Sequence, residues 1–347
     1  MNARKQYNSL DIAKFIAAIL IIIIHANPFS TYSNVAAYAF RNIIATVAVP
    51  FFFVTSGFLF AVKLNSLPNE EKASYFKKYF LRLLTMYLLW SAVYFIFVLA
   101  DWIKNGFTYT DLLIYVRDFF FEGSYSTIWF LPALMTAVTI VYILKKRFTY
   151  FQIFLMALPF YLFACLGSSY YGLTQQIPLL GDLFKVYYSF FDTIKNGVLF
   201  GWVYVALGGI FSENTEKFIM PFKKSFILIA VFFVIMVAET VGQRLLGWSS
   251  KGVDTKLMLL PLTLFIFSLI LSVKCSNKTI YIWMRKLSLL MFLSQRIFLS
   301  LFDLFLVDTI FVQNSVIYFS SILCLTLLFS YLFIKLSDKI KVLKMFY

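Results

Sequence analysis

The only histidine of the chain, His25, stands near the end of an apolar run that also carries Asp11 and Lys14 near its start. An imidazole binds and releases a proton near neutral pH, which suits it to general-base chemistry. In an α-helix of about 100° and 1.5 Å per residue, the steps from Lys14 to His25 place both side chains on one face, about 16 Å apart along the axis. Asp11 falls about 40° to the other side of His25 on the same stripe. Ionisable residues inside an apolar span are functional candidates by default.

Each of these residues also has a purely structural explanation. Lys14 could extend its ammonium to the membrane surface as an anchor, and a lone histidine is often only a hydrogen-bonded core residue. For Lys14 taken alone we prefer the anchor, whereas for His25 taken with the rest of the chain we prefer the functional explanation. Asp11 and Lys14 are three residues apart on a helix, so the carboxylate could pair with the ammonium and hold it.

Composition places the chain among integral membrane proteins, because hydrophobic residues make up 61% of it and the mean hydropathy is +0.83. A cleaved signal peptide is the competing explanation of the N-terminus, where Arg4 and Lys5 precede the apolar run. Lys14 and His25 interrupt that run, and the small-x-small site at 37–39 lies far beyond its end. We therefore expect the run to be a membrane span.

Hydropathy predicts an all-α polytopic integral membrane protein with about ten transmembrane helices. The expected spans are residues 10–29, 43–62, 80–102, 128–144, 151–167, 196–211, 226–241, 256–273, 287–306 and 316–335. Of the 31 Lys and Arg residues, 21 fall on the side of the N-terminus and 8 on the other side, which predicts that both termini are cytoplasmic. Because the charges sort by side of the membrane, the net charge of +15 does not indicate nucleic-acid binding.

No repeat, linker or low-complexity tail divides the sequence, so we expect residues 1–347 to form a single membrane-embedded domain without a separate soluble domain. Cys165, Cys275 and Cys324 lie in or beside different apolar segments, and their spacing is typical of neither a metal site nor a disulfide framework. We expect no metal.

Two long outer loops, 103–127 and 168–195, are rich in aromatic and polar residues. They could form a lid or a platform for an acceptor, or they could only anchor the protein at the membrane interface. Lys195, at the start of the sixth span, could likewise have a function or could be only an interfacial anchor. In the ninth span, Arg296 and Asp303 are about two helical turns apart, and we expect them to pair.

The chain resembles the membrane acyltransferase type 3 family over nearly its full length. The landmarks, in order, are Lys14-x10-His25, VPFFFVTSGFLF around 50–60, KKYFLRLL at 77–84, IWFLPAL at 128–134, KNGVLFGWVYVALGG at 195–209 and LSLLMFLSQ at 287–295. Three positions depart from the family pattern. Lys14 and Lys195 stand where many members have Arg, and Gln295 stands where the pattern commonly has His. Lysine lacks the bidentate geometry of arginine, which affects ligand recognition more than the type of reaction.

The resemblance implies an O-acyltransferase of a bacterial plasma (inner) membrane that moves an acetyl group from cytoplasmic acetyl-CoA to a hydroxyl of a cell-surface or lipid-linked glycan. His25 would be the general base, with Ser56 a weaker candidate for an acyl carrier or oxyanion donor. Donor binding is expected at the inner side, from Lys14, Lys78 and Arg82. The remaining landmark residues, expected to bind substrate, are Asp11, Trp129, Lys195, Asn196 and Gln295. The lipid bilayer and the glycan are the implied partners.

Two other classes of protein stay open. A transporter or flippase of a glycan or lipid precursor would suit ten spans and buried charges, but such proteins usually show duplicated halves, and none is apparent in this sequence. A catalytically silent membrane scaffold would have no need of the lone histidine. The ordered landmarks favour an enzyme.

Overall fold

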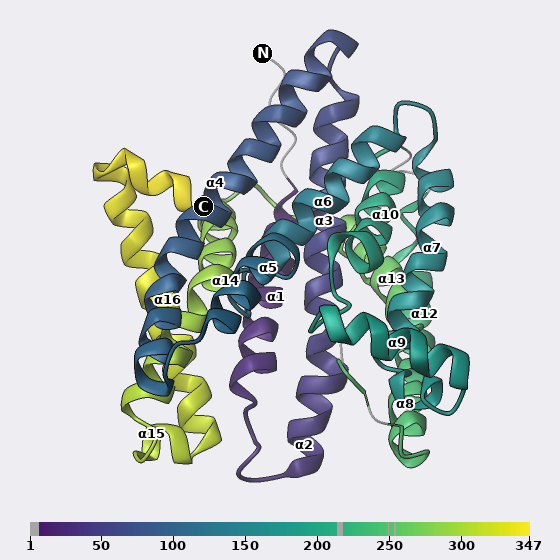
Figure 1. Ribbon diagram of the computed structural model, residues 1–347. Helices are drawn as coiled ribbons and strands as arrows, with labels where there is room; N and C mark the ends of the chain where they lie inside the picture. Colours follow the sequence, from purple (N-terminus) through teal and green to yellow (C-terminus); the bar gives the residue numbers. More distant parts are fainter. Residues whose placement is uncertain (1–6, 214–217, 249, 253–254) are drawn as a thin grey trace.

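The computed structural model describes residues 7–213, 218–248, 250–252 and 255–347, and those residues form a helical bundle without strands (Figure 1). Within these described residues, seven helical stretches are long and apolar enough to cross a membrane: α1 (Asn8–Ala26), α2 to α3 (Asn34–Asn65), α4 (Asn69–Asn105), α7 (Tyr150–Gly167), α12 (Phe222–Leu245), α14 (Thr279–Phe305) and α16 (Ser315–Lys339). Three apolar helices are shorter: α6 (Phe130–Leu144), η3 with α10 (Gly197–Glu213) and α13 (Leu259–Ser272). Each of the ten predicted spans falls on one of these helices, and the count of ten crossings stays a prediction.

The second span is a composite helix. It runs without a break through α2 (Asn34–Ala39), η1 (Phe40–Ile44), η2 (Ala45–Val47) and α3 (Ala48–Asn65). The π and 3-10 turns of η1 and η2 lie before Pro50. Pro50 is in the first turn of α3, where the backbone N–H that proline lacks is not needed for an α-helical hydrogen bond. A change of winding therefore separates the outer part of this span from α3.

Helix α4 extends beyond the bilayer. Its 37 residues give a length of about 55 Å, well above the roughly 30 Å of a hydrocarbon core. The start of α4 projects above the other helices in Figure 1. The first 14 residues of α4 include Lys72, Lys77, Lys78 and Arg82, so this basic part lies on the side of the membrane that the charge count predicts to be cytoplasmic.

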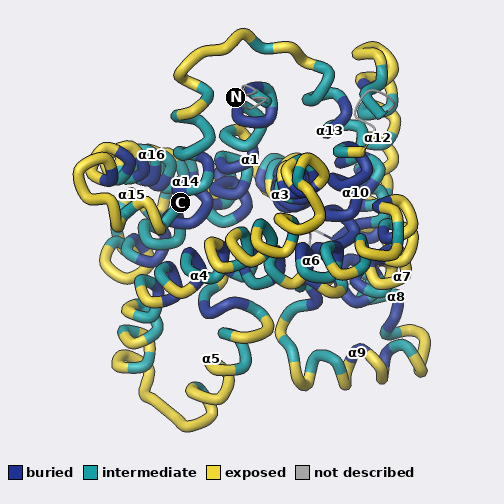
Figure 2. The backbone as a smooth tube through the Cα atoms, turned by 90° about the horizontal axis from the view of Figure 1, so that it is seen from above, coloured by how far each residue is buried: buried dark blue, intermediate teal, exposed yellow. Residues whose placement is uncertain are grey.

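The two long loops that are predicted to lie on the outer side contain helices, whereas the sequence interpretation treated them as irregular. Helix α5 (Tyr109–Phe121) begins with a capping box of Thr108 and Asp111, and α9 (Pro178–Phe190) begins with proline at its first turn. Short α8 (Tyr171–Thr174) precedes α9. Figure 2 shows α5 and α9 extending away from the bundle, with large exposed stretches. Apolar spacing at helical period explains why these segments fold as helices.

The centre of the bundle is the crossing of α3 and α10, which two glycines allow. A Cβ at Gly57 would lie 2.4 Å from the carbonyl oxygen of Val205, and one at Gly208 would lie 2.2 Å from that of Val54. Small residues let helix backbones approach in this way inside membranes. The SG and GG landmarks of the sequence are thus contact points between two helices.

The remaining core is aromatic, and the C-terminal segment is held against it. Phe52 of α3, Phe130 of α6 and Phe292 of α14 contact one another, with ring centroids 5.2 to 6.2 Å apart. After α16, the short η4 (Lys341–Phe346) folds back, and the Trp90 indole N–H donates to the carbonyl of Phe346 at 3.1 Å. Helices α3, α4, α6, α14 and α16 therefore meet around one apolar centre.

Gly57→Ala is expected to lower the melting temperature of the protein in detergent, because its methyl group would press on backbone that has no freedom to move aside. Overpacking of this kind costs about 1–3 kcal/mol. Gly242→Ala is the matched control, since a Cβ there on α12 would meet nothing within 4 Å and helix propensity would favour it. Equal melting temperatures for the two variants would contradict the close crossing.

Candidate functional site

The N-terminal end of α1 carries an ion group with a buried carboxylate at its centre. The Asp11 carboxylate is 3% exposed and lies 3.0 Å from Lys14 Nζ on its own helix. Arg285 of α14 donates to it through Nε at 3.0 Å and through a terminal nitrogen at 2.6 Å. The predicted pairing of Asp11 with Lys14 is confirmed, and Arg285 is a partner that the sequence interpretation missed. The group carries one net positive charge.

Arg285 helps to compensate the charge of the buried Asp11 carboxylate inside an apolar helix. A charge removed from water is tolerated only with close partners and further hydrogen bonds, and an arginine fork supplies two of them in one plane. In the sequence, Arg285 is one of many basic residues on the side predicted to be cytoplasmic. The indication of its role was indirect: a carboxylate inside an apolar helix, as at Asp11, is expected to need a second cationic partner besides Lys14.

Helices α1 and α14 run side by side in the same direction. At one end the Asn8 amide donates to the side chain of Asn277, just before α14, at 2.9 Å. At the other end Thr31, after α1, bonds the hydroxyl of Ser315, the first residue of α16, at 2.8 Å. The pairing of Asp11 with Arg285 therefore fixes a parallel register between the two helices.

That register sets the level of His25. The imidazole lies about 21 Å along α1 from Asp11, and Gln295 lies about 15 Å along α14 from Arg285, so the two are about one turn apart in height. Helix α1 ends at Ala26, one residue after His25, because Asn27 adopts the left-handed conformation (φ 47°) and Pro28 follows. His25 thus stands in the last turn of α1 and is half-buried, nearer the outer end than the expected run to Phe29 implied.

Ser56 lies on α3 next to the contact glycine Gly57 and is half-buried. It follows Phe52 by one helical turn, so it shares the side of α3 that faces Phe130 and Phe292. This direction is toward α6 and α14 and away from α10. The structure places Ser56 inside the bundle, one turn from the aromatic centre.

Three predicted substrate residues meet at the other end of the bundle. The Lys195 ammonium lies 5.3 Å from the centre of the Trp129 ring, a distance typical of a cation–π contact. Asn196 caps η3 (Gly197–Gly201), accepting from the N–H groups of Val198 and Leu199 at 3.0 and 2.8 Å. The side-chain oxygen of Asn196 therefore supports the helix start, and Lys195 and Trp129, both half-buried, are the other predicted substrate residues of this corner.

A tether between the outer helices fixes this corner. Glu122 accepts the N–H groups of Asp192 and Thr193 at 3.1 and 2.9 Å, just before Lys195. Burial raises the pKa of the Glu122 carboxyl, and the two N–H donors oppose that rise. Arg117 of α5 binds Asp118 and Asp192 at 2.6 and 2.5 Å. The carboxylates of Asp118, Glu122 and Asp192 are close enough for a metal ion, but the Arg117 guanidinium already pairs with Asp118 and Asp192 and offsets one of the three negative charges.

Two residues of the predicted donor site stand apart from the ion group. Lys78 and Arg82 are exposed on the first part of α4, whereas the Lys14 side chain is only 13% exposed beside Asp11. The structure therefore has two separate cationic regions, one solvated and one largely shielded from solvent, in place of a single cluster. Arg4, Lys5 and Lys217, which the charge count placed on this side, lie outside the described residues.

The outer half of α14 is rich in buried polar groups. Gln295 is fully buried, and its amide donates weakly to the carbonyl of Phe292 at 3.3 Å. Tyr94 of α4 donates to the carbonyl of Leu293 at 2.5 Å. The side-chain oxygens of Ser294 and Gln295 have no hydrogen-bond partner among the described residues. Buried polar atoms left this way are expected to find a ligand or water.

The expected pairing of Arg296 with Asp303 is wrong. Asp303 is exposed and accepts from the Tyr318 hydroxyl at 3.1 Å. The described ion pairs include none between Asp303 and Arg296. Spacing of two turns puts both residues on one face, but the exposed Asp303 carboxylate near the end of α14 bonds to Tyr318 instead of to the half-buried Arg296.

Fold and site define a polytopic, all-helical membrane protein in which one helix carries a buried ion group at one end and the only histidine at the other. The chain belongs to the acyltransferase type 3 family, because the family described as acyltransferase domain matches residues 7–335. Acyl transfer is the reaction class of that family.

Curated relatives carry a different name. The chain is 28% identical over 281 residues to an amino-acid racemase of Enterococcus faecalis, which is 80% of this chain and 38% of that protein. It is 28% identical over 270 residues to a serine/alanine racemase of Enterococcus gallinarum, covering 76% of this chain and 37% of that protein. The chain thus spans less than two fifths of the length of these relatives. No solved structure matches the chain significantly.

Arg285→Ala is expected to destabilise the protein by about 1–3 kcal/mol, because it leaves the Asp11 carboxylate buried with one partner while the lost arginine was itself partly solvated. Adding Asp11→Asn should recover part of the loss, since the buried charge is then gone. Thermal unfolding in detergent measures both, with Lys339→Ala as an exposed control. An Arg285→Ala variant as stable as Lys339→Ala would show that the ion group does not hold α1 to α14.

Proposed function

We propose that the chain is a membrane O-acyltransferase that moves an acetyl group from cytoplasmic acetyl-CoA to a hydroxyl of a cell-surface or lipid-linked glycan at a bacterial plasma membrane. The observation that carries the proposal is the layout of α1. Its only histidine and its buried cation share one face about 16 Å apart, in a chain of an acyltransferase family.

The donor enters from the inner side in this proposal. The phosphates of coenzyme A are anionic, and the exposed Lys78 and Arg82 attract them, while the half-exposed Arg285 and the buried Lys14 give the entrance one net positive charge after Asp11 is counted. The pantetheine arm then follows the face of α1 that lies against α14. A span of about 16 Å from Lys14 to His25 is within the reach of such an extended arm.

The acceptor arrives from the outer side. Trp129 offers an aromatic face suited to a sugar ring, and Lys195 beside it attracts an anionic or hydroxyl-rich head group. His25 in the last turn of α1 is half-buried, so a hydroxyl coming from this side needs to enter the bundle only slightly.

The chemistry is one substitution at the thioester carbon. His25 removes the proton of the acceptor hydroxyl as its oxygen attacks the carbonyl, the bond from carbon to sulfur breaks, and the coenzyme A thiolate leaves and takes up a proton. Donors for the developing oxyanion are the hydroxyl of Ser294, whose oxygen has no partner among the described residues, or the hydroxyl of Ser56 in this scheme. The same scheme accommodates an acyl group carried briefly by His25 or Ser56.

His25→Ala is expected to lower acetyl transfer by about a hundredfold or more, the usual contribution of a positioned general base. The measurement follows label from acetyl-CoA into the glycan fraction of membranes, with protein level and membrane insertion checked in parallel. Survival of glycan acetylation in this variant would end the enzyme proposal as given. If glycan translocation were lost while acetylation was never present, a flippase would be indicated.

A Lys78→Glu, Arg82→Glu double variant is expected to raise the KM for acetyl-CoA roughly two- to tenfold while kcat stays unchanged, because exposed charges assist binding more than the chemical step. The effect should shrink as salt is raised, since exposed charges are screened. Lys339→Glu, exposed at the end of α16, is the control. An unchanged KM would remove α4 from the donor site.

A further inference from the structure

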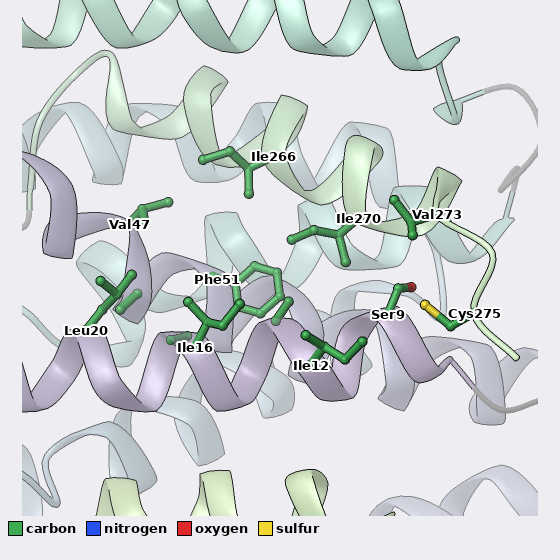
Figure 3. A pocket seen from close by; sticks show the side chains of 13 residues that line it. Ser9, Ile12, Ile16, Leu20, Val47, Phe51, Ile266, Ile270, Val273 and Cys275 are labelled. Atoms are coloured by element: carbon green, nitrogen blue, oxygen red, sulfur yellow. The ribbon is translucent and has the colours of Figure 1, made fainter. Parts of the chain in front are cut away.

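An apolar groove of about 290 Å³ lies on the face of α1 opposite the ion group and His25 (Figure 3). Its α1 wall includes Ile12, Ile16 and Leu20, and its opposite wall comes from α13 and the start of α3. The direction of Ile16 on the helix is about 160° from that of Lys14. The groove is therefore separate from the path assigned to the donor.

The groove is open to the bilayer along its length. Ile16 is 52% exposed and Val273, on the other wall, is 42% exposed. Its lining is apolar except at one end, where the Ser9 hydroxyl and the Cys275 thiol lie together (Figure 3). A site with this shape and lining suits a hydrocarbon chain that slides in from the side.

The depth of the groove matches one leaflet. From Ser9 to Leu20 it extends about 16 Å along α1, which is about half of a hydrocarbon core of roughly 30 Å. Its polar end is at the start of α1, the end that the charge count predicts to be cytoplasmic. An acyl chain of the inner leaflet would run from that end to the middle of the membrane.

Positive charge stands at the polar end. The segment VKCSNK at 273–278 includes no acidic residue, and both Lys274 and Lys278 are exposed. Asn8 anchors this segment to the start of α1, through the carbonyl of Ser276 at 3.2 Å and the side chain of Asn277 at 2.9 Å. The two lysines are thus held at the entrance where a lipid head group would lie.

We propose that this groove is a binding site for one acyl chain of an anionic phospholipid of the inner leaflet, with its phosphate against Lys274 and Lys278. An occupant here fills the space between α1 and α13, so the site would also set how closely these two helices approach. The proposal does not depend on the acetyl-transfer scheme, because the groove and the donor path lie on opposite faces of α1.

The test uses the full chain in vesicles that contain either phosphatidylglycerol or phosphatidylcholine with a photoreactive group midway along one acyl chain. After irradiation, mass spectrometry maps the labelled peptides. We expect phosphatidylglycerol label to concentrate on residues 12–20 and 266–273, well above the label on the exposed face of α12. Label spread evenly over all lipid-facing helices, or equal for both lipids, would overturn the proposal.

Two variants separate the head group from the groove. Lys274→Gln with Lys278→Gln changes only exposed side chains, and each substitution is expected to lower phosphatidylglycerol labelling about two- to fivefold. Ala13→Phe fills the groove and should lower labelling by either lipid. Unchanged labelling in both variants, or displacement of the label by a long-chain acyl-CoA and not by phosphatidylglycerol, would contradict the assignment.

His25→Ala distinguishes this proposal from the acetyl-transfer scheme. Labelling does not require turnover, so the variant should label like the unaltered protein even when acetyl transfer is lost. In the unaltered protein, acetyl transfer without preferential labelling of the groove would count against the lipid site alone.

Discussion

The structure depends on a carboxylate that is held inside an apolar helix. Asp11 is almost fully removed from solvent and is tolerable there only because Lys14 and Arg285 both reach it. Since Arg285 belongs to α14, the pairing fixes α1 against that helix in height and in rotation. Everything that α1 presents elsewhere, His25 included, takes its position from this contact.

Helix α1 consequently serves two environments. One face meets α14 and carries the ion group and the histidine, and the other face borders an apolar groove. Glycines elsewhere in the bundle, Gly57 and Gly208, bring α3 and α10 into backbone contact. The bundle is thus tight at its centre and loosely closed where α1 faces α13, which is where a lipid chain can be accommodated without disturbing the polar side.

Sequence periodicity and hydropathy predicted the helices well, because apolar length is what a bilayer requires of a span. The family and the pairing of Asp11 with Lys14 also followed from short-range pattern. Arg285 could not be assigned, since it is 274 residues away and contact between α1 and α14 has no local signature. The end of α1 at Ala26 depended on Asn27 and Pro28, whose turn chemistry was present in the sequence but was read as continuing helix. Pairing of Arg296 with Asp303 failed because a shared helix face does not guarantee a shared environment.

The account predicts one location for the donor. Cryo-electron microscopy of the protein with a non-hydrolysable thioether analogue of acetyl-CoA would test it most directly. We expect the nucleotide near Arg285 and the pantetheine arm between α1 and α14. The acetyl group should lie close enough to His25 for a hydroxyl that is hydrogen-bonded to the imidazole to reach the carbonyl carbon. A coenzyme bound at the outer side, in the groove between α1 and α13, or with its acetyl group more than one helical turn from His25 would contradict the account.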